Sequence, residues 1–212
     1  MRKMKNWLKI LVIIPAFFLL FSCNRIVNDS RSDSVLLIVR LQGTDIDDNE
    51  ADFLQSDVVK VDATTGQSTV AADAALVTFT TASLDPAPLL GTSQYFDIFV
   101  THYTVTYSRT DGKNQEGVDI PYSFDGAMSV QVRVESETAA NFVIVRAVSK
   151  LEPPLVNLAS GRGEGELKVT ARIDFYGHDT EGNKLKATGY LTIFFANYIT
   201  DEEAPAGGGG GN

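Results

Sequence analysis

The feature that most constrains this fold is a strict alternation of side chains in the last third of the chain. Between residues 167 and 175 every second residue is apolar, and the residues between them are polar. The alternation of apolar residues returns between 185 and 195, after the turn-rich segment 177–183. A period of two puts successive side chains on opposite faces of a strand. The two segments therefore predict a long antiparallel hairpin with one buried face.

Similar signals recur through most of the chain before this hairpin. Apolar residues alternate, or form short runs between turn residues, in six earlier segments that we expect to be strands. These segments are 35–41, 58–61, 75–81, 96–107, 128–134 and 141–148. Only the segment 49–55 has a helical pattern. About eight strands without amphipathic helices between them predict an all-β fold, an antiparallel two-sheet β-sandwich.

Two of these strands carry more detailed expectations. In 96–107 the alternation places Phe99 on the buried face and His102 on the opposite one. The segment 141–148, from Asn141 to Val148, is apolar on both faces except at Arg146. We therefore expect both faces of that strand to be covered.

The N-terminus has the composition of a targeting segment. Four basic residues accompany an apolar run over 10–21, which is too short for a membrane span of about 20 residues. The run ends in Leu-Phe-Ser-Cys, and this resembles the lipobox of bacterial lipoproteins. The resemblance implies cleavage after Ser22 and lipid on the thiol of Cys23. An aspartate directly after the lipidated cysteine retains such proteins at the inner membrane. This chain has Asn24 there, so the resemblance favours the outer membrane. A plain secretory signal or an uncleaved anchor is the alternative.

These signals divide the chain into four parts. Residues 1–22 are the expected signal peptide, and 23–33 are the acylated cysteine and a polar tether. Residues 34–200 are the expected sandwich. The Gly-rich tail, 201–212, is expected to be disordered.

Charge and cysteine content exclude several classes of protein. The chain has 27 acidic and 18 basic residues, a formal net charge of −9, and such a field repels the phosphates of a nucleic acid. The expected signal peptide holds four basic residues and no acidic one, so its removal would leave a net charge of about −13. A single cysteine excludes a disulfide framework.

Two motifs in the body carry a family resemblance. The turn Asp179-Thr-Glu-Gly182-Asn183 between long strands resembles a hairpin of Ig-like and fibronectin-III-like domains in exported bacterial proteins. The strand Tyr103-Thr-Val105-Thr-Tyr107 is similar to a core strand of fibronectin-III-like modules. The resemblance implies an Ig-like sandwich. Because the body exceeds the roughly 100 residues of a standard domain, it needs extra strands or long loops.

No catalytic motif is evident. Nucleophilic catalysis needs a base, most often His, beside Ser or Cys. The chain has two histidines, and we expect His102 to be an ordinary sheet-face residue and His178 a turn residue. Cys23 is expected to carry lipid. The sequence therefore predicts a protein that is not an enzyme.

Two segments offer candidate binding residues. The acidic residues Asp45, Asp47 and Asp48 cluster on one loop, as oxygen ligands of Ca²⁺ do, although the spacing departs from an EF-hand; a solvated acidic loop is the alternative. No other cofactor is expected. The long loop 110–126 carries Tyr122 and Phe124, which either pin the loop to the sandwich or contact a partner.

The sequence thus predicts a membrane-anchored lipoprotein of the bacterial envelope that acts as a non-catalytic binding, scaffolding or assembly module. Lipid on Cys23 would hold it in the membrane. An envelope protein or a glycan would be its partner, and no nucleic acid is expected. The alternative is a carbohydrate-active or cell-wall hydrolase of the envelope that uses surface carboxylates.

Overall fold

A computed structural model describes residues 32–61, 65, 67–84, 94–159 and 165–198. The expected signal peptide 1–22, the lipidation site Cys23, nearly all of the tether and the tail 201–212 lie outside the described residues. The chain divides into two compact units, Met1–Ser32 and Asp33–Asn212, and the sheets lie in the second. Among the described residues, no helix is long and apolar enough to cross a membrane.

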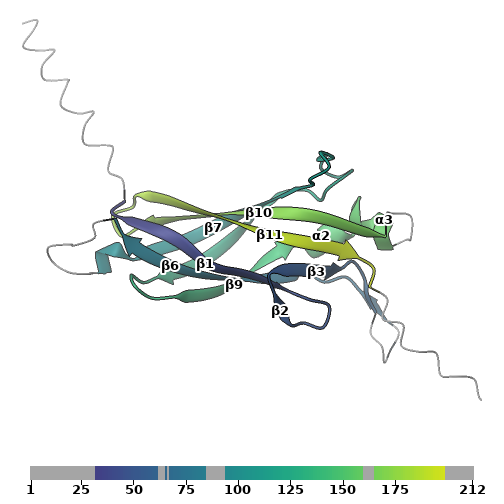
Figure 1. Ribbon diagram of the computed structural model, residues 1–212, viewed down its shortest axis with the longest axis horizontal. Helices are drawn as coiled ribbons and strands as arrows, with labels where there is room; N and C mark the ends of the chain where they lie inside the picture. The colour runs from purple at the N-terminus through teal and green to yellow at the C-terminus, as the bar shows by residue number, and fades with distance from the viewer. Residues whose placement is uncertain (1–31, 62–64, 66, 85–93, 160–164, 199–212) are drawn as a thin grey trace, which may run out of the picture. The chain divides into compact units, whose positions relative to one another are not determined.

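Two β-sheets pack face to face, which confirms the predicted all-β, two-sheet sandwich (Figure 1). The first sheet has four strands in the order β2-β1-β6-β9, with bounds β1 (Ser34–Thr44), β2 (Glu50–Ala51), β6 (Asp73–Ser83) and β9 (Thr138–Val145). The second has five in the order β3-β11-β10-β7-β8, with bounds β3 (Phe53–Asp57), β7 (Ile98–Ser108), β8 (Phe124–Val132), β10 (Glu166–Asp179) and β11 (Lys184–Ala196). A separate small sheet pairs β4 (Lys60–Val61) with β5 (Ser68–Thr69).

Strand alternation builds the core between the two sheets. The side chains predicted to face inward on β10, from Leu167 to Phe175, are all buried. Aromatic rings of both sheets meet at the centre. The ring of Phe175 in the second sheet lies 5.0 Å from that of Phe79 and 5.2 Å from that of Phe142, both edge to face. Each such pair adds roughly 0.5–1.5 kcal/mol beyond the burial of its area, so these contacts tie one sheet to the other.

The predicted hairpin of β10 and β11 is confirmed. Its pairing runs unbroken from Glu166 opposite Ala196 to His178 opposite Lys184. In the turn, the Asp179 carboxylate accepts the backbone N–H groups of Glu181 and Asn183 at 3.0 and 2.8 Å. The motif residue Gly182 has a φ of 87°, a conformation in which a Cβ would be strained. The turn motif therefore fixes the register of the longest strands of the fold.

The helix predicted at 49–55 is wrong. The segment forms β2, which pairs with β1, and most of β3, which joins the other sheet in parallel to β11. This parallel pair departs from the otherwise antiparallel pairing of the two sheets. The crossing is tight at Gly43, where an added Cβ would overlap the backbone carbonyl of Phe53. Pairing with distant strands overrides the local helical pattern here.

The strand expected at 141–148 ends earlier and is covered on one face only. β9 stops at Val145, and α2 (Ala147–Lys150) and then α3 (Leu155–Ala159) follow. Val143 and Asn141 are exposed because β9 is the edge strand of the four-stranded sheet and its outer face meets solvent. Helices this short contain too few turns to give a periodic sequence signal.

A β-bulge corrects the prediction for Phe99. The partners of β7 run from Phe99 opposite His178 to His102 opposite Tyr176, so Thr101 is the extra residue on β7. One extra residue inverts the faces of everything on one side of it. Ile98 and Val100 consequently face the core with Tyr103, whereas Phe99 lies on the outer face.

Candidate functional site

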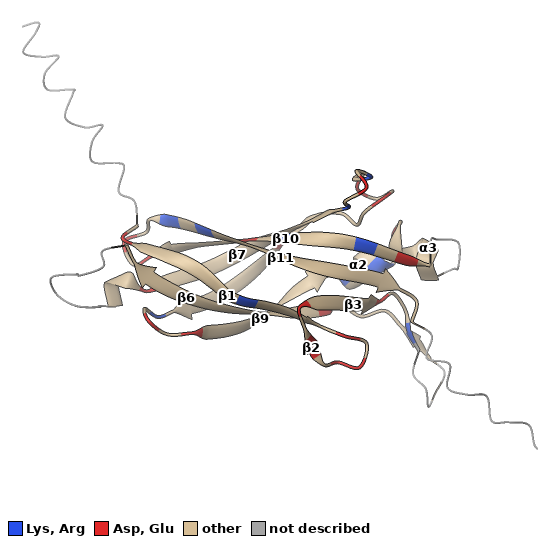
Figure 2. Cartoon of the chain, viewed as in Figure 1, with Lys and Arg blue, Asp and Glu red and all other residues tan. Residues whose placement is uncertain are grey.

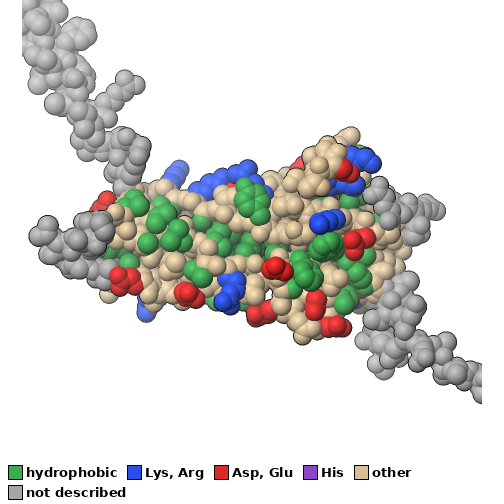
Figure 3. Space-filling view, in the orientation of Figure 1, with side chains coloured by type: hydrophobic (Ala, Val, Ile, Leu, Met, Phe, Trp, Pro, Cys, Tyr) green, Lys and Arg blue, Asp and Glu red, His purple; other side chains and the backbone are tan. Residues whose placement is uncertain are grey.

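The outer face of the five-stranded sheet gathers basic and aromatic side chains on a chain that is acidic as a whole. We call this surface the basic face. Strands β10, β11 and β7 supply it with Lys168, Arg172, Tyr176, His178, Lys184, Lys186, Tyr190, Phe194, Phe99 and His102. Figure 2 shows blue segments along β10 and β11, whereas red gathers around the β2 loop. In Figure 3 the blue side chains gather on the β10–β11 side of the view.

One carboxylate is held among the cations of this face. Asp174 Oδ2 lies 3.0 Å from Lys186 Nζ and 3.2 Å from Arg172 Nη2, and its Oδ1 accepts the hydroxyl of Thr188 at 2.7 Å. Desolvation alone would raise the pKa of Asp174, but the hydrogen bonds from Thr188 and Lys186 and the two positive charges outweigh it and lower that pKa. Asp125 of β8, opposite Thr104, and Glu166 at the start of β10 lie on the same face. The four lysine and arginine side chains of the face still outnumber its carboxylates.

Four of the rings on this face stand in two stacked pairs across β7 and β10. The rings of His102 and Tyr176 lie 4.8 Å apart and nearly parallel, and Lys186 Nζ covers Tyr176 at 5.4 Å. One row along, the rings of Phe99 and His178 stack at 5.6 Å. The bulge at Thr101 is what brings Phe99 out to this face.

A pocket of about 420 Å³ opens at these rings and contains both histidines of the chain. It lies between segments 76 positions apart that the β7–β10 pairing brings together. Its lining residues are Thr101, His102, Tyr176, Gly177, His178, Gly182, Lys184 and Leu185. No acidic residue is among them, so an anion in this pocket would meet the ammonium of Lys184 without a carboxylate beside it in the lining.

The hydrogen bonds of the pocket fix the tautomer of one imidazole. His178 Nδ1 lies 2.8 Å from the carbonyl oxygen of Asp179, which can only accept, so Nδ1 carries the proton and Nε2 offers a lone pair in the neutral state. His102 Nδ1 lies 2.9 Å from the hydroxyl of Thr101, which lies 3.4 Å from the carbonyl oxygen of Tyr176. The Thr101 hydroxyl can donate to or accept from this ring.

Sequence reasoning missed this pocket because it treated the two histidines one at a time. The outward positions of Lys186, Tyr176 and His102 follow from the strand alternation. The register that puts them in one row does not. One sequence signal could have indicated the pocket: Tyr176 and Lys186 both stand at outward positions of consecutive predicted strands.

The predicted calcium ligands lie on a turn that uses one of them internally. The Asp45 carboxylate accepts the backbone N–H groups of Asp47 and Asn49 at 3.0 and 2.8 Å, and also the Asn49 side chain. These hydrogen bonds, that of the Asn49 side chain first, lower the pKa of Asp45. In the described part of the chain, no group of three or more His, Cys, Asp or Glu residues is placed to hold a metal ion. Binding of Ca²⁺ at Asp45, Asp47 and Asp48 stays a prediction.

The predicted binding residues of the long loop separate in the structure. Phe124 begins β8 and is 8 % exposed, with its ring against Tyr103 and the Arg146 guanidinium 4.7 Å from its centre. Tyr122 is 46 % exposed and its ring packs on Gly117, where an added Cβ would overlap it. Phe124 thus pins the loop to the sandwich, which was one of the two alternatives. Of the two aromatic residues, Tyr122 is the one exposed to solvent.

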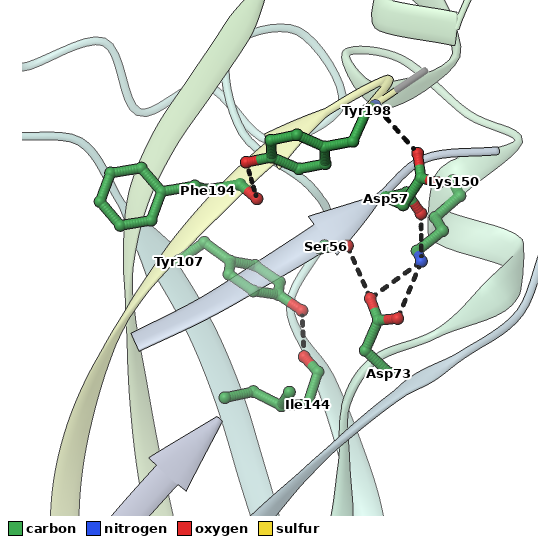
Figure 4. Close-up of polar contacts among 8 residues, drawn as sticks. All are labelled: Ser56, Asp57, Asp73, Tyr107, Ile144, Lys150, Phe194 and Tyr198. Carbon is green, nitrogen blue, oxygen red and sulfur yellow. Dashed lines mark hydrogen bonds and ion pairs between the residues drawn. The ribbon is translucent and has the colours of Figure 1, made fainter. Parts of the chain in front are cut away.

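Figure 4 shows a second polar cluster, where α2 packs against β3 and the start of β6. Lys150 is 1 % exposed, and its ammonium donates to the carbonyl of Asp57 at 2.7 Å and lies 2.9 Å from Asp73 Oδ2. The same carboxylate accepts the Ser56 hydroxyl at 2.6 Å. Asp57 accepts the backbone N–H of Tyr198 at 3.2 Å, which ties down the chain after β11. Every member has a protein partner, so this cluster acts as a structural clamp.

Carboxylates also line a smaller pocket, of about 240 Å³, beside this clamp. Asp45, Asp48 and Asp73 contribute to it together with Lys60. A glycoside hydrolase needs one carboxyl that stays protonated near neutral pH. The pKa of Asp45 is lowered and Asp73 is paired with Lys150. Neither has the environment of a general acid.

Comparison with protein-family models, with curated proteins and with solved structures finds no match to this chain. The geometry of the described residues is therefore the basis for the functional proposal.

Proposed function

We propose that this chain is a lipid-anchored, non-catalytic binding module of the bacterial cell envelope, and that the basic face is its binding surface. One observation carries the proposal: an acidic chain gathers cations and aromatic rings on one outer sheet face, around a pocket with no acidic lining. Tyr190 on this face is 63 % exposed. Exposed charge and aromatic area of this kind stabilise a fold little and suit contact with a partner.

The anchor is part of the same proposal and rests on the lipobox resemblance at Cys23. The tether 24–33 would span roughly 35 Å if fully extended, at about 3.3–3.6 Å per residue. The module would therefore act close to the outer membrane. The hairpin turn at Asp179 and the core strand from Tyr103 support placing the sandwich with Ig-like domains. Incorporation of labelled palmitate by the wild-type chain, and its loss in Cys23→Ala, would test the anchor.

The binding surface is tested by crosslinking in intact cells with a tagged full chain. The test variant, Lys184→Gln with Tyr190→Ser, removes one cation and one tyrosine of the basic face. The matched control, Arg40→Gln with Tyr122→Ser, removes the same chemistry from the outer side of β1 and from the long loop. Neither Lys184 nor Arg40 forms an ion pair with a described residue, so both variants should keep the fold, which circular dichroism would check.

We expect the crosslinked complexes of the wild type to persist in the control and to fall at least about fivefold in the test variant. Loss in the control alone would move the binding surface to the loop around Tyr122. Equal crosslinking in all three chains would refute the basic face as the binding surface.

A further inference from the structure

The cations of the basic face follow a line along the hairpin. Lys184 and Lys186 stand at one end of β11, Arg172 lies opposite Tyr190, and Lys168 lies opposite Phe194. Ten residues of strand separate positions 184 and 194, which is about 33 Å at 3.3 Å per residue. Four cations over this length give one per roughly 11 Å, whereas duplex DNA carries one charge per about 1.7 Å. The line matches a long, thin and sparsely charged anion.

The pocket at one end of this line is suited to a single acidic group. Lys184 supplies a cation that no described residue pairs with, and Thr101 and Tyr176 supply hydroxyls. A protonated imidazole donates from both ring nitrogens, so each Nε2 can donate to a ligand while Nδ1 keeps its partner within the protein. An acidic group could thus accept from both rings and from the ammonium.

We propose that this pocket binds one acidic group, a carboxylate, phosphate or sulfate, of an anionic polysaccharide that runs along the basic face. The inference deepens the proposed function and rests on it. The ring of Tyr190, which is 63 % exposed, lies on the same line and suits the C–H surface of a sugar ring.

An anionic bilayer fits this surface less well than a polymer does. A flat anionic membrane that meets the basic face also meets the field of the whole chain, whose net charge is −9. A polymer lying along the hairpin interacts within a Debye length of about 8–10 Å, where the local cations dominate.

Binding should strengthen as the pH falls toward about 5, because protonation of an imidazole adds positive charge beside Lys184. The groups facing His102 are Tyr176 and Asp174 of β10, Lys186 of β11 and Asp125 of β8. Those facing His178 are Lys184 of β11 and Phe99 of β7, and Asp179 follows it at the turn. The carboxylates of Asp125, Asp174 and Asp179 accept hydrogen bonds from protein groups, so protonation of an imidazole adds positive charge at the pocket.

Direct binding by the full chain, purified in detergent, tests this inference. The probes are hyaluronate, which has one carboxylate in every second sugar, neutral dextran, duplex DNA, and vesicles of phosphatidylglycerol. Binding is measured near pH 5.5 and near pH 7.5 for the wild type, for His102→Gln with His178→Gln, and for the control Arg40→Gln. Glutamine keeps a polar side chain but cannot take up a proton.

We expect hyaluronate to bind, dextran not to bind, and the affinity for hyaluronate to be about fivefold higher near pH 5.5 than near pH 7.5. The histidine variant should keep the weaker affinity at both pH values, and Arg40→Gln should behave as the wild type. Equal binding of hyaluronate and dextran, an unchanged pH dependence in the histidine variant, or tighter binding of vesicles or DNA would each overturn the inference. The crosslinking test is independent, because a neutral or protein partner would preserve its outcome while hyaluronate fails to bind.

Discussion

The buried pair Lys150–Asp73 gives the sharpest prediction about stability. Replacing Asp73 with Asn keeps the shape of the side chain but leaves the ammonium of Lys150 without its counterion. At the observed 2.9 Å, two unit charges attract by about 6 kcal/mol at an effective dielectric constant of 20. Part of this is offset by the desolvation of both groups, and removal of one partner of a buried pair typically costs about 3–5 kcal/mol.

Lys150→Met removes the charge and keeps most of the aliphatic stem. It leaves the carbonyl of Asp57 without its donor, a loss of about 1–3 kcal/mol, while Asp73 keeps the hydroxyl of Ser56.

We therefore expect Asp73→Asn to lower the free energy of unfolding more than Lys150→Met does. The double variant should resemble Lys150→Met, because without the ammonium the loss of the carboxylate costs little. Urea unfolding of the full chain, followed by far-ultraviolet circular dichroism, measures all three values. A loss below about 1 kcal/mol in Asp73→Asn, or additive losses in the double variant, would refute the role of the pair as a clamp.

Four further predictions address other parts of the molecule. Tyr107→Phe removes the buried hydrogen bond to the carbonyl of Ile144, 2.7 Å long, and should lower the free energy of unfolding by about 1–3 kcal/mol in the same urea assay. The lowered pKa of Asp174 stabilises the fold above the ordinary carboxyl pKa of about 4 and loses this effect as pH falls through the folded-state pKa, so the stability difference between wild type and Asp174→Asn should shrink in acid unfolding. If Ca²⁺ binds at Asp45, Asp47 and Asp48, it should raise the melting temperature and a chelator should reverse the rise, whereas an unchanged melting temperature would rule the calcium site out. Incubation of the chain with cell-wall and other polysaccharides should release no reducing ends, and release abolished by one Asp or Glu substitution would favour a hydrolase.

The strands were predictable wherever alternation alone decides them. The hairpin of β10 and β11, its inward face and its turn at Asp179 all follow from local sequence, because a period of two and a capped turn need no distant partner. The errors fall where a distant partner decides. β3 takes its conformation from its parallel neighbour β11, and the inward or outward position of Phe99 depends on a single extra residue at Thr101.

The candidate site was predictable in part. The alternation places Arg172, Lys186 and Tyr190 at outward positions of their strands, and this marks the outer face of the hairpin as polar. The meeting of His102 with His178 could not be predicted, since it depends on the register of β7 against β10 after the bulge. Nor does any local pattern place Lys150 next to Asp73, 77 positions apart.

The sequence by itself determined which residues alternate, where the long hairpin turns, and the lipobox at Cys23 from which the envelope anchor is proposed. These are properties of neighbouring residues, and a chain expresses them before it folds. The tertiary structure alone decided which outward side chains share a row, which face Phe99 takes, and that a buried lysine finds its carboxylate. Strand register and sheet packing couple residues far apart in sequence, and one inserted residue is enough to exchange the two faces of a strand.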